Sequence, residues 1–362
     1  MSTTDTSKKE STTKIVVITG AAGRIAYSLI PLICSGQVFG TNVRVELRLL
    51  DMDMAADRLQ GVAMELEDCN FPLLVNCTAT LSAEEAFRGA DVAVLLGGFP
   101  RLQGMERKDL ITKNAEGMRE QAQAIDRFAK PSIKVCIVAN PANTNCLVAM
   151  KFAPSVPPEN FTCLTRLDEE RLRGFVLQKA RGKGVSVATA LQIKDMSIWG
   201  NHSATQVPYI DCGYIEMEGG TKLQVAGLYS EDEKKELISL VQNRGAAIIS
   251  KQQASSGLSA ANAIANHLSD WLNPGVPVDK VFSMGVLSTG NPYGVPDGLV
   301  YSFPLRRTGG GEGGFEIVKD LPVGPHVRAM LNASSSELQE ERRDAESLVG
   351  DITVMSKASS RL

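Results

Sequence analysis

Short apolar runs alternate with longer amphipathic patterns along the first half of the chain. Arg44–Leu50 alternates between apolar and polar residues, whereas Asp91–Gly97 and Lys134–Ala139 are continuously apolar. These runs and the β-branched run Lys14–Thr19 are too short for helices and predict strands. Continuously apolar strands are typical of parallel sheets that are buried on both faces. Helical patterns fall between the strands, over Met54–Glu67 and Leu110–Ala129. Repeated strand–helix units predict the α/β class, with a doubly wound parallel sheet.

The second half of the chain has a more mixed pattern. A chain of 362 residues exceeds the usual size of one hydrophobic core, so we expect two domains. We predict a disordered tail over 1–13, a first domain over 14–165, a second α/β or α+β domain over 166–350, and a tail over 351–362. Apolar patterns predict strands at Lys222–Val225, Val281–Leu287 and Gly298–Pro304, helices at Glu231–Gly245, Ser255–Asp270 and Ser334–Leu348, and a strand with its exit over Val185–Ile198.

The composition is that of an ordinary globular protein, with 43% hydrophobic and 22% charged residues. A net charge of −3 gives no electrostatic reason to expect nucleic acid or an anionic membrane as a partner. No apolar run reaches the roughly 18 residues that a membrane helix needs. The polar first dozen residues do not form a signal peptide. The seven cysteines are scattered and include no Cys-x-x-Cys pair, which favours buried reduced thiols in a reducing compartment over a zinc site. We predict no metal.

A glycine turn follows the first predicted strand. In Gly20-Ala21-Ala22-Gly23-Arg24-Ile25-Ala26, the two glycines would let the backbone approach a diphosphate at a helix N-terminus, and Ala26 stands at the packing position. Such turns are common after strands, so the motif alone is weak. The second predicted strand ends at Asp51, whose carboxylate could bind both ribose hydroxyls of NAD and would repel a 2′-phosphate. Asp53 is a nearby competitor for this role.

Residues suited to acid–base chemistry and anion binding lie elsewhere in the chain. His202, in the sequence Trp-Gly-Asn-His-Ser, could exchange a proton near neutral pH, although an isolated histidine is more often a surface-loop residue. His326 follows Gly-Pro in a predicted turn, and neither it nor His267 is assigned any chemistry. Asp168 and Arg171 share a helix face, either as a local ion pair or as an acid facing a histidine and an arginine facing an anion.

A loop over 97–107 carries glycines towards both ends, which suggests that it can move, and two arginines, Arg101 and Arg107. Two guanidinium groups would suit a substrate with two carboxylates, but a solvated basic loop explains these residues better when they are considered alone. Asn140-Pro141 follows a predicted strand, and a polar side chain there would face the cofactor crevice. A cis bond before Pro141 would aim Asn140.

Considered together, these segments resemble one enzyme family. GAAGRIAYSL, LLDMD, MELEDCNFPLL, GMERKDL, NPANTNC, ENFTCLTRLDEERLR, IWGNHSATQ, SMGV and YGVPDGLVYSFP are similar to the NAD-dependent malate dehydrogenases of the cytosolic type, in the lactate/malate dehydrogenase superfamily. The match runs from about Lys14 to about Leu348. It implies a Rossmann domain, a substrate domain and a homodimer that acts on malate and oxaloacetate.

The resemblance also implies a role for each matched residue. His202 would be the proton donor and acceptor and Asp168 its partner. A dicarboxylate would be held by Arg101, Arg107, Arg171 and Asn140. The NAD contacts implied are Gly20, Ala21, Ala22, Gly23, Arg24, Ile25, Ala26, Asp51, Asn114, Gln121, Val138 and Asn140. Arg24 departs from the glutamine common in the family fingerprint, which puts its cofactor contact in doubt, and the glycine-rich hairpin tip over 309–314 is extra.

Other functions remain open at this point. A lactate-type or aromatic 2-hydroxy acid dehydrogenase would share the fold and the His–Asp pair but would lack Arg101. NAD-dependent glycosidases use a similar fold but do not match this chain in the arginine loop or in the histidine motif. A non-catalytic NAD sensor would not require the arginines, His202 and Asp168 together. The C-terminal Ser360-Arg361-Leu362 is a variant of the Ser-Lys-Leu peroxisomal address. The close alternative is that the tripeptide occurs by chance in a tail and that the protein is cytosolic.

Overall fold

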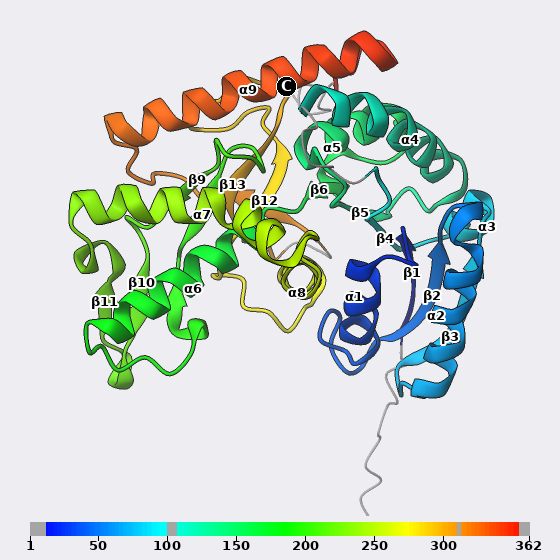
Figure 1. The fold of residues 1–362 in the computed structure, drawn as a ribbon, viewed down its shortest axis with the longest axis horizontal. Helices are drawn as coiled ribbons and strands as arrows, with labels where there is room; N and C mark the ends of the chain where they lie inside the picture. The colour runs from blue at the N-terminus through cyan, green and yellow to red at the C-terminus, as the bar shows by residue number, and fades with distance from the viewer. Residues whose placement is uncertain (1–11, 100–106, 310–312, 355–362) are drawn as a thin grey trace, which may run out of the picture.

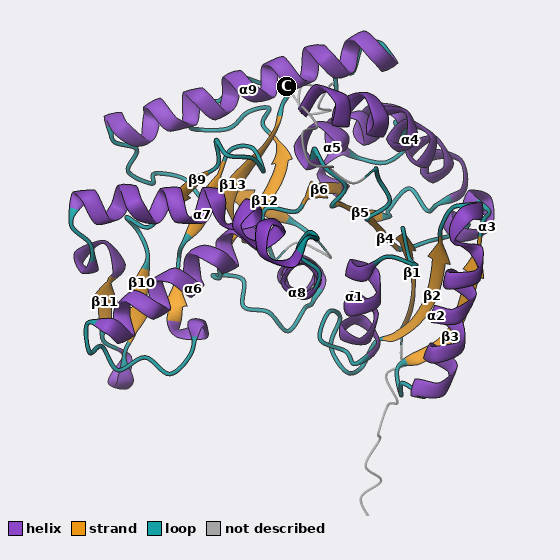
Figure 2. Cartoon of the chain, viewed as in Figure 1, coloured by secondary structure: helices purple, strands orange, loops and turns teal. Residues whose placement is uncertain are grey.

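The computed structural model describes residues 12–99, 107–309 and 313–354, and for residues 107–110 it describes the backbone only. In this part of the chain a nine-stranded sheet has the order β14-β13-β12-β6-β5-β4-β1-β2-β3 (Figures 1 and 2). Strands β1 to β6 are parallel and stand in the order 3-2-1-4-5-6 of a Rossmann sheet. They span Thr13–Thr19, Arg44–Leu50, Leu74–Thr80, Val92–Leu95, Lys134–Ile137 and Phe161–Cys163.

Antiparallel strands extend the sheet beyond β6. They are β12 (Val281–Leu287), β13 (Val300–Arg307) and β14 (Phe315–Ile317). Gly285 of β12 pairs with Cys163 of β6. The sheet therefore changes from parallel to antiparallel where the two halves of the chain meet.

Helices cover both faces of the sheet. Neighbouring residues of a strand point to opposite faces, so apolar side chains on the two faces pack in two separate core clusters. Val16 and Ile18 of β1 belong to one core cluster, and Val17 belongs to the other. The first cluster includes residues of α1 (Arg24–Cys34), α2 (Ala56–Cys69) and α8 (Leu258–Leu272). The second includes residues of α3 (Ala83–Phe87), α4 (Arg107–Phe128) and α5 (Ala142–Phe152).

The long helix α9 (Pro325–Val349) connects the two clusters. Leu331 and Leu338 pack in the first, and Ala345 and Val349 pack in the second. Figure 1 shows this helix running along one side of the molecule, beside α4 and α5 at one end and over the second domain at the other.

The rest of the second domain packs around a third cluster that contains Leu172, Val176 and Val241. It includes α6 (Arg166–Gly182) and α7 (Glu231–Gln252), a small sheet of β7 (Ile193–Lys194), β10 (Tyr214–Glu216) and β11 (Lys222–Gln224), and the pair β8 (Ser197–Trp199) and β9 (Val207–Tyr209). Short 3-10 turns are η1 (Asp53–Ala55), η2 (Pro158–Asn160), η3 (Ala190–Gln192), η4 (Glu218–Gly220) and η5 (Val225–Leu228).

Several predicted elements match the structure, and others differ from it. The predicted strands Arg44–Leu50 and Val281–Leu287 have the observed bounds. Val185–Ile198 is not one strand, because a capped 3-10 turn and a left-handed Asp195 divide it into β7 and β8. His326 lies in the first turn of α9 rather than in a turn before it, since Pro325 fits the first position of a helix. The predicted tail overlaps β1, which begins at Thr13.

All seven cysteines are free, but only four of them are buried as predicted. Cys34, Cys136, Cys146 and Cys163 are buried, but Cys69 is exposed and Cys77 and Cys212 are half-buried. Burial raises the pKa of Cys136 to about 12, so it stays a thiol near neutral pH. Among the described residues, no His, Cys, Asp and Glu group of three or more has the arrangement of a metal site. None of the described helices combines the length and apolarity that crossing a membrane requires.

The contact between Gly285 and Cys163 gives a test of how the two sheet halves meet. A Cβ placed at Gly285 would lie 2.1 Å from Cys163 Sγ, so Gly285→Ala must overpack this junction. We expect a loss of about 1–3 kcal/mol in the free energy of unfolding, measured by urea denaturation. Replacing Cys163 with Ala in the same chain should recover part of the loss.

Gly174→Ala in α6 is the matched control, because a Cβ there meets no atom within 4 Å. It should be neutral or stabilising, since alanine is the better helix former. If Gly285→Ala were as harmless as Gly174→Ala, the close approach of β12 to β6 would be wrong.

Candidate active site

His202 and Asp168 lie together, although 34 residues separate them in the chain. His202 follows β8 and Asp168 lies in the first turn of α6. The imidazole Nδ1 is 2.5 Å from Asp168 Oδ2. The histidine side chain is 18% exposed, whereas the carboxylate has no exposure. The pair therefore has its acid inside the protein and one edge of the histidine open to a ligand.

Asp168 has further partners that hold it as an ion. Burial alone would raise its pKa, but His202, Arg171 and a hydrogen bond from Gln206 together lower it. The Arg171 Nη1 group donates to Asp168 Oδ1 at 2.9 Å. An ionised Asp168 accepts the Nδ1–H of His202, which leaves the other ring nitrogen to exchange a proton with a ligand.

Arg171 has a donor left over. Its side chain is 12% exposed, and its buried Nε has no hydrogen-bond partner among the described residues. The Nη2 group is 3.4 Å from Ser256 Oγ. A buried guanidinium with an unused N–H beside a histidine fits an anion such as a carboxylate.

Two buried serines connect α6, which carries Asp168, to β8, which precedes His202. Ser302 Oγ lies 2.8 Å from Thr165 Oγ1 and donates to the Ile198 carbonyl at 2.7 Å. Ser283 Oγ accepts the Ile198 N–H at 2.9 Å, and Ser283 N–H donates to Glu169 at 2.7 Å. Since Thr165 and Glu169 flank Asp168, these serines set the spacing between α6 and β8.

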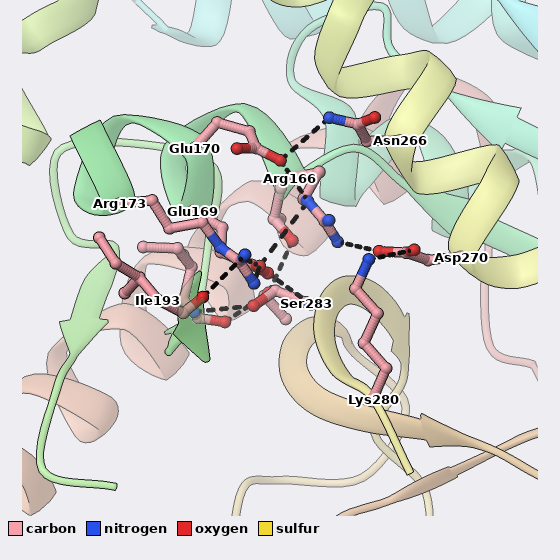
Figure 3. Close-up of polar contacts among 12 residues, drawn as sticks. Arg166, Glu169, Glu170, Arg173, Ile193, Asn266, Asp270, Lys280 and Ser283 are labelled. Atoms are coloured by element: carbon pink, nitrogen blue, oxygen red, sulfur yellow. Dashed lines mark hydrogen bonds and ion pairs between the residues drawn. The ribbon is translucent and has the colours of Figure 1, made fainter. Parts of the chain in front are cut away.

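The first turns of α6, which include Asp168, also carry a network of buried and half-buried charges (Figure 3). It contains three cations and three carboxylates: Arg166, Arg173, Lys280, Glu169, Glu170 and Asp270. Arg166 is 2.6 Å from Asp270 and 2.8 Å from Glu170, and Arg173 is 2.8 Å from Glu169. Burial would lower the pKa of Arg166, but the carboxylates raise it, so the guanidinium stays charged. Because the charges balance, α6 can be buried with its polar first turns intact.

His267 lies beside this network and does not take part in proton exchange near neutral pH. Its ring is fully buried, with Nε2 2.9 Å from Thr162 Oγ1. Burial, and then the charge of Arg166, lowers the pKa of His267 to about 3. Leaving His267 without chemistry agrees with this environment.

The glycine turn has the geometry of a dinucleotide cradle. Gly20 has a φ of +65°, and a Cβ there would lie 3.0 Å from the backbone of Gly97. Gly23 caps α1 without a side-chain hydrogen bond and is exposed, so the first N–H groups of the helix are open to a phosphate. These residues fit NAD.

Asp51, rather than Asp53, is joined to this turn. Its Oδ2 accepts the Ala22 N–H at 2.9 Å, and its Oδ1 accepts the Met52 N–H at 2.9 Å. Asp53 is exposed in η1. The end of β2 therefore holds a carboxylate against the fingerprint, as the ribose contact of NAD requires.

The other cofactor residues implied by the resemblance differ in their contacts and in their exposure. Asn114 uses its amide on the backbone: it accepts from Phe99 N–H at 2.5 Å and donates to the Asn140 carbonyl at 2.7 Å. Gln121 donates to the Gly117 carbonyl of its own helix. Val138 is half-buried, and Asn140 is exposed before a cis peptide bond to Pro141. Asn114 thus ties the start of the arginine loop to the end of β5.

Most of the arginine loop lies outside the described residues. Arg101 lies outside the described residues, and Arg107 begins α4 with only its backbone described. Sequence reasoning missed Asn143, whose Oδ1 accepts the His202 backbone N–H at 2.9 Å, and it missed Gln206 beside Asp168. Both lie within motifs that carried the resemblance, NPANTNC and IWGNHSATQ, which was the signal available.

The chain is similar to known proteins over most of its length. Two family models match: lactate/malate dehydrogenase, NAD binding domain, over residues 13–162, and lactate/malate dehydrogenase, alpha/beta C-terminal domain, over residues 165–349. A cytoplasmic malate dehydrogenase of Zea mays is 45% identical over 329 residues, which is 90% of this chain and 96% of that protein.

Solved structures are similar in the same way. A malate dehydrogenase of Naegleria fowleri has a TM-score of 0.83 and 40% identity, covering 93% of this chain and 99% of its own. A lactate dehydrogenase of Trichomonas vaginalis, solved with NADH and oxamate, has a TM-score of 0.86 and 34% identity, with coverage of 93% and 99%. The predicted family, the predicted Rossmann fold and the predicted NAD cofactor are confirmed.

The buried carboxylate predicts how stability depends on pH. A pKa lowered on folding means that ionised Asp168 stabilises the protein above its unfolded pKa of about 3.9, and this contribution is lost as pH falls through the folded value. Asp168→Asn should cost on the order of 3–5 kcal/mol at pH 7, as for other broken buried pairs. Urea unfolding at pH 7 and in steps below pH 4 should show the gap between wild type and variant shrinking with acidification. A gap that stayed constant would mean that the pKa of Asp168 is not lowered.

Proposed function

This chain belongs to the lactate/malate dehydrogenase family, and we propose that it catalyses the reversible oxidation of (S)-malate to oxaloacetate with NAD. The single observation that supports this chemistry best is the buried Asp168, which contacts His202 on one oxygen and Arg171 on the other. A proton-transfer group and an anion-binding group are thereby held side by side.

In the proposed mechanism His202 handles the proton. Neutral His202 accepts the hydroxyl proton of malate, and the imidazolium returns it to oxaloacetate in the reverse direction. Asp168 keeps the proton of Nδ1 in place and stabilises the imidazolium through its charge. Bound in the glycine turn, NAD would supply the acceptor for the hydride that leaves C2 of malate.

The arginines and the asparagine would bind and orient the substrate. Arg171 would hold the C1 carboxylate through its unused donor. By resemblance, Arg107 would polarise the carbonyl oxygen, Arg101 would hold the distal carboxylate, and Asn140 would contact substrate and nicotinamide.

The cofactor would be held by the glycine turn and its surroundings. The residues that we assign to it are Gly20, Ala21, Ala22, Gly23, Arg24, Ile25, Ala26, Asp51, Val138 and Asn140, with Asn114 and Gln121 nearby. Asp51 would favour NAD over its 2′-phosphorylated form by repelling the phosphate.

We also propose the arrangement of domains and subunits. The NAD-binding domain would span 14–165 and the substrate domain 166–350. A homodimer is supported by apolar side chains that the described chain leaves exposed on three helices: Tyr27 on α1, Met64 on α2 and Leu258 on α8, with exposures of 53%, 58% and 81%. Of these helices, α1 and α8 pack against each other. Ser360-Arg361-Leu362 would direct the protein to a peroxisome-like organelle, with the cytosol as the alternative; the tripeptide lies outside the described residues.

The substrate assignment depends on Arg101 and can be tested directly. We expect NADH oxidation with oxaloacetate to exceed that with pyruvate and phenylpyruvate, since only oxaloacetate brings a second carboxylate. Losing one partner of a buried charged pair costs about 3–5 kcal/mol, so Arg101→Gln should lower kcat/KM for oxaloacetate by about 10²- to 10⁴-fold and narrow the preference over pyruvate. Arg171→Gln is the matched control, because it should impair both 2-oxo acids. An unchanged oxaloacetate-to-pyruvate ratio in Arg101→Gln would remove Arg101 as the selector.

The proton role of His202 predicts opposite pH dependences in the two directions. His202 and Arg171 lower the pKa of Asp168, so this carboxylate stays ionised near neutrality and the proton is exchanged at the imidazole. As pH rises, kcat/KM for oxaloacetate should fall because the imidazolium is lost; as pH drops, kcat/KM for malate should fall because the neutral imidazole is lost. Asp168→Asn should lower both. Profiles that rise and fall in parallel would contradict the assignment of His202.

A further inference from the structure

The segment that carries His202 contacts one face of α9. Ser334, Glu337 and Glu341 lie three and four residues apart, so they share a helix face. Ser334 Oγ accepts the Asn201 N–H at 2.8 Å. The Asn201 amide donates to both carboxylates, at 2.8 Å to Glu337 and 2.7 Å to Glu341. Asn201 is fully buried, so the residue just before His202 is enclosed by this helix face.

Glu337 contacts residues that precede and follow His202 in the chain. Its Oε2 accepts hydrogen bonds from Asn201 Nδ2, from the Ser203 hydroxyl and, at 2.6 Å, from the Thr205 hydroxyl. Three donors from positions 201, 203 and 205 thus converge on one oxygen. An ionised carboxylate suits this arrangement, because a neutral amide oxygen is a weaker acceptor and an amide NH2 group would face other donors.

The conformation of the segment leaves little freedom for another arrangement. Gly200 has a φ of +93°, and a Cβ there would lie 2.3 Å from Ser334 Oγ, so the backbone is pressed against α9. The His202 N–H donates to Asn143 Oδ1 of α5 at 2.9 Å. The histidine backbone is therefore held by α5, while Glu337 of α9 bonds to residues before and after it in the chain.

We propose that Glu337 is a positioning residue for His202, which acts through Asn201, Ser203 and Thr205 to hold the imidazole where it can exchange a proton with the substrate. This inference rests on the proposed function. The inference goes beyond the proposed function, because nothing in the proton chemistry itself requires a residue of α9. Proton and hydride transfer demand reacting atoms in near-contact, so a small displacement of this segment should slow the chemical step more than it weakens binding.

The test compares Glu337→Gln with Glu340→Gln in the full-length enzyme. Glu340 lies on the same helix, is exposed, and loses the same charge when substituted. In Glu337→Gln we expect kcat for oxaloacetate reduction to fall about 10- to 100-fold, the scale expected for a misplaced catalytic group. The KM for NADH should stay within about twofold of the wild-type value, because the cofactor cradle is untouched. Glu340→Gln should behave as wild type.

An isotope effect separates positioning from folding. With NADH that carries deuterium at the transferred position, the effect on kcat should grow in Glu337→Gln, because the chemical step becomes slower relative to other steps. Circular dichroism and thermal melting give the folded fraction. If the loss of kcat disappeared after correction for that fraction, or if the isotope effect stayed at the wild-type value, the inference would be overturned.

Removing a donor gives an independent check. Ser203→Ala deletes one hydrogen bond to Glu337 without a change of charge. If both residues act through the same contact, Glu337→Gln and Ser203→Ala combined should lower kcat less than the product of their separate effects. Fully multiplicative effects would count against the inference. A wild-type enzyme without oxaloacetate reductase activity would instead reject the proposed function, so the two failures are distinguishable.

Discussion

A negative charge on Asp168, with no exposed surface, is the constraint on which the candidate active site depends. A buried ion needs hydrogen-bond donors from the protein, because water is not there to supply them. His202 and Gln206 supply donors from the segment between β8 and β9, and Arg171 supplies one from α6. Each of these donors is fixed by the same bond that it provides. The requirement to solvate one carboxylate therefore orients a proton-transfer group and an anion-binding group together.

The sheet supplies the frame for this arrangement. Its antiparallel extension brings β12 and β13 next to β6, and buried Ser283 and Ser302 on these strands bond to both α6 and β8. The balanced charge network of Figure 3 lets the first turns of α6 be buried at this point. A helix start and a strand end, which usually lie at a protein surface, are here held at a spacing that one His–Asp hydrogen bond can bridge.

The residue pattern predicted the first domain better than the second, for a physical reason. Strands buried on both faces, such as β4 and β5, have continuously apolar sequences that local patterns reveal. β7 and β8 are only two and three residues long. β7 is held by pairing with β10, and β8 by a hydrogen bond to Ser283, and no local sequence pattern records these contacts. Asp168 and His202 could be chosen as candidates from their motifs, and resemblance paired them. The role of Asn143 depends on a contact across 59 residues, which the pattern could not predict.

The position of α9 in the chain has a consequence for how the protein is made. Synthesis on a ribosome proceeds from the N-terminus, so the Rossmann strands and the His202 segment emerge before α9 does. The contacts of Glu337 with that segment span 132 to 136 residues, and they form only after the helix has left the exit tunnel. The segment around His202 therefore lacks these contacts in a nascent chain until α9 has emerged. The support of the catalytic histidine is completed by one of the last elements to be synthesised.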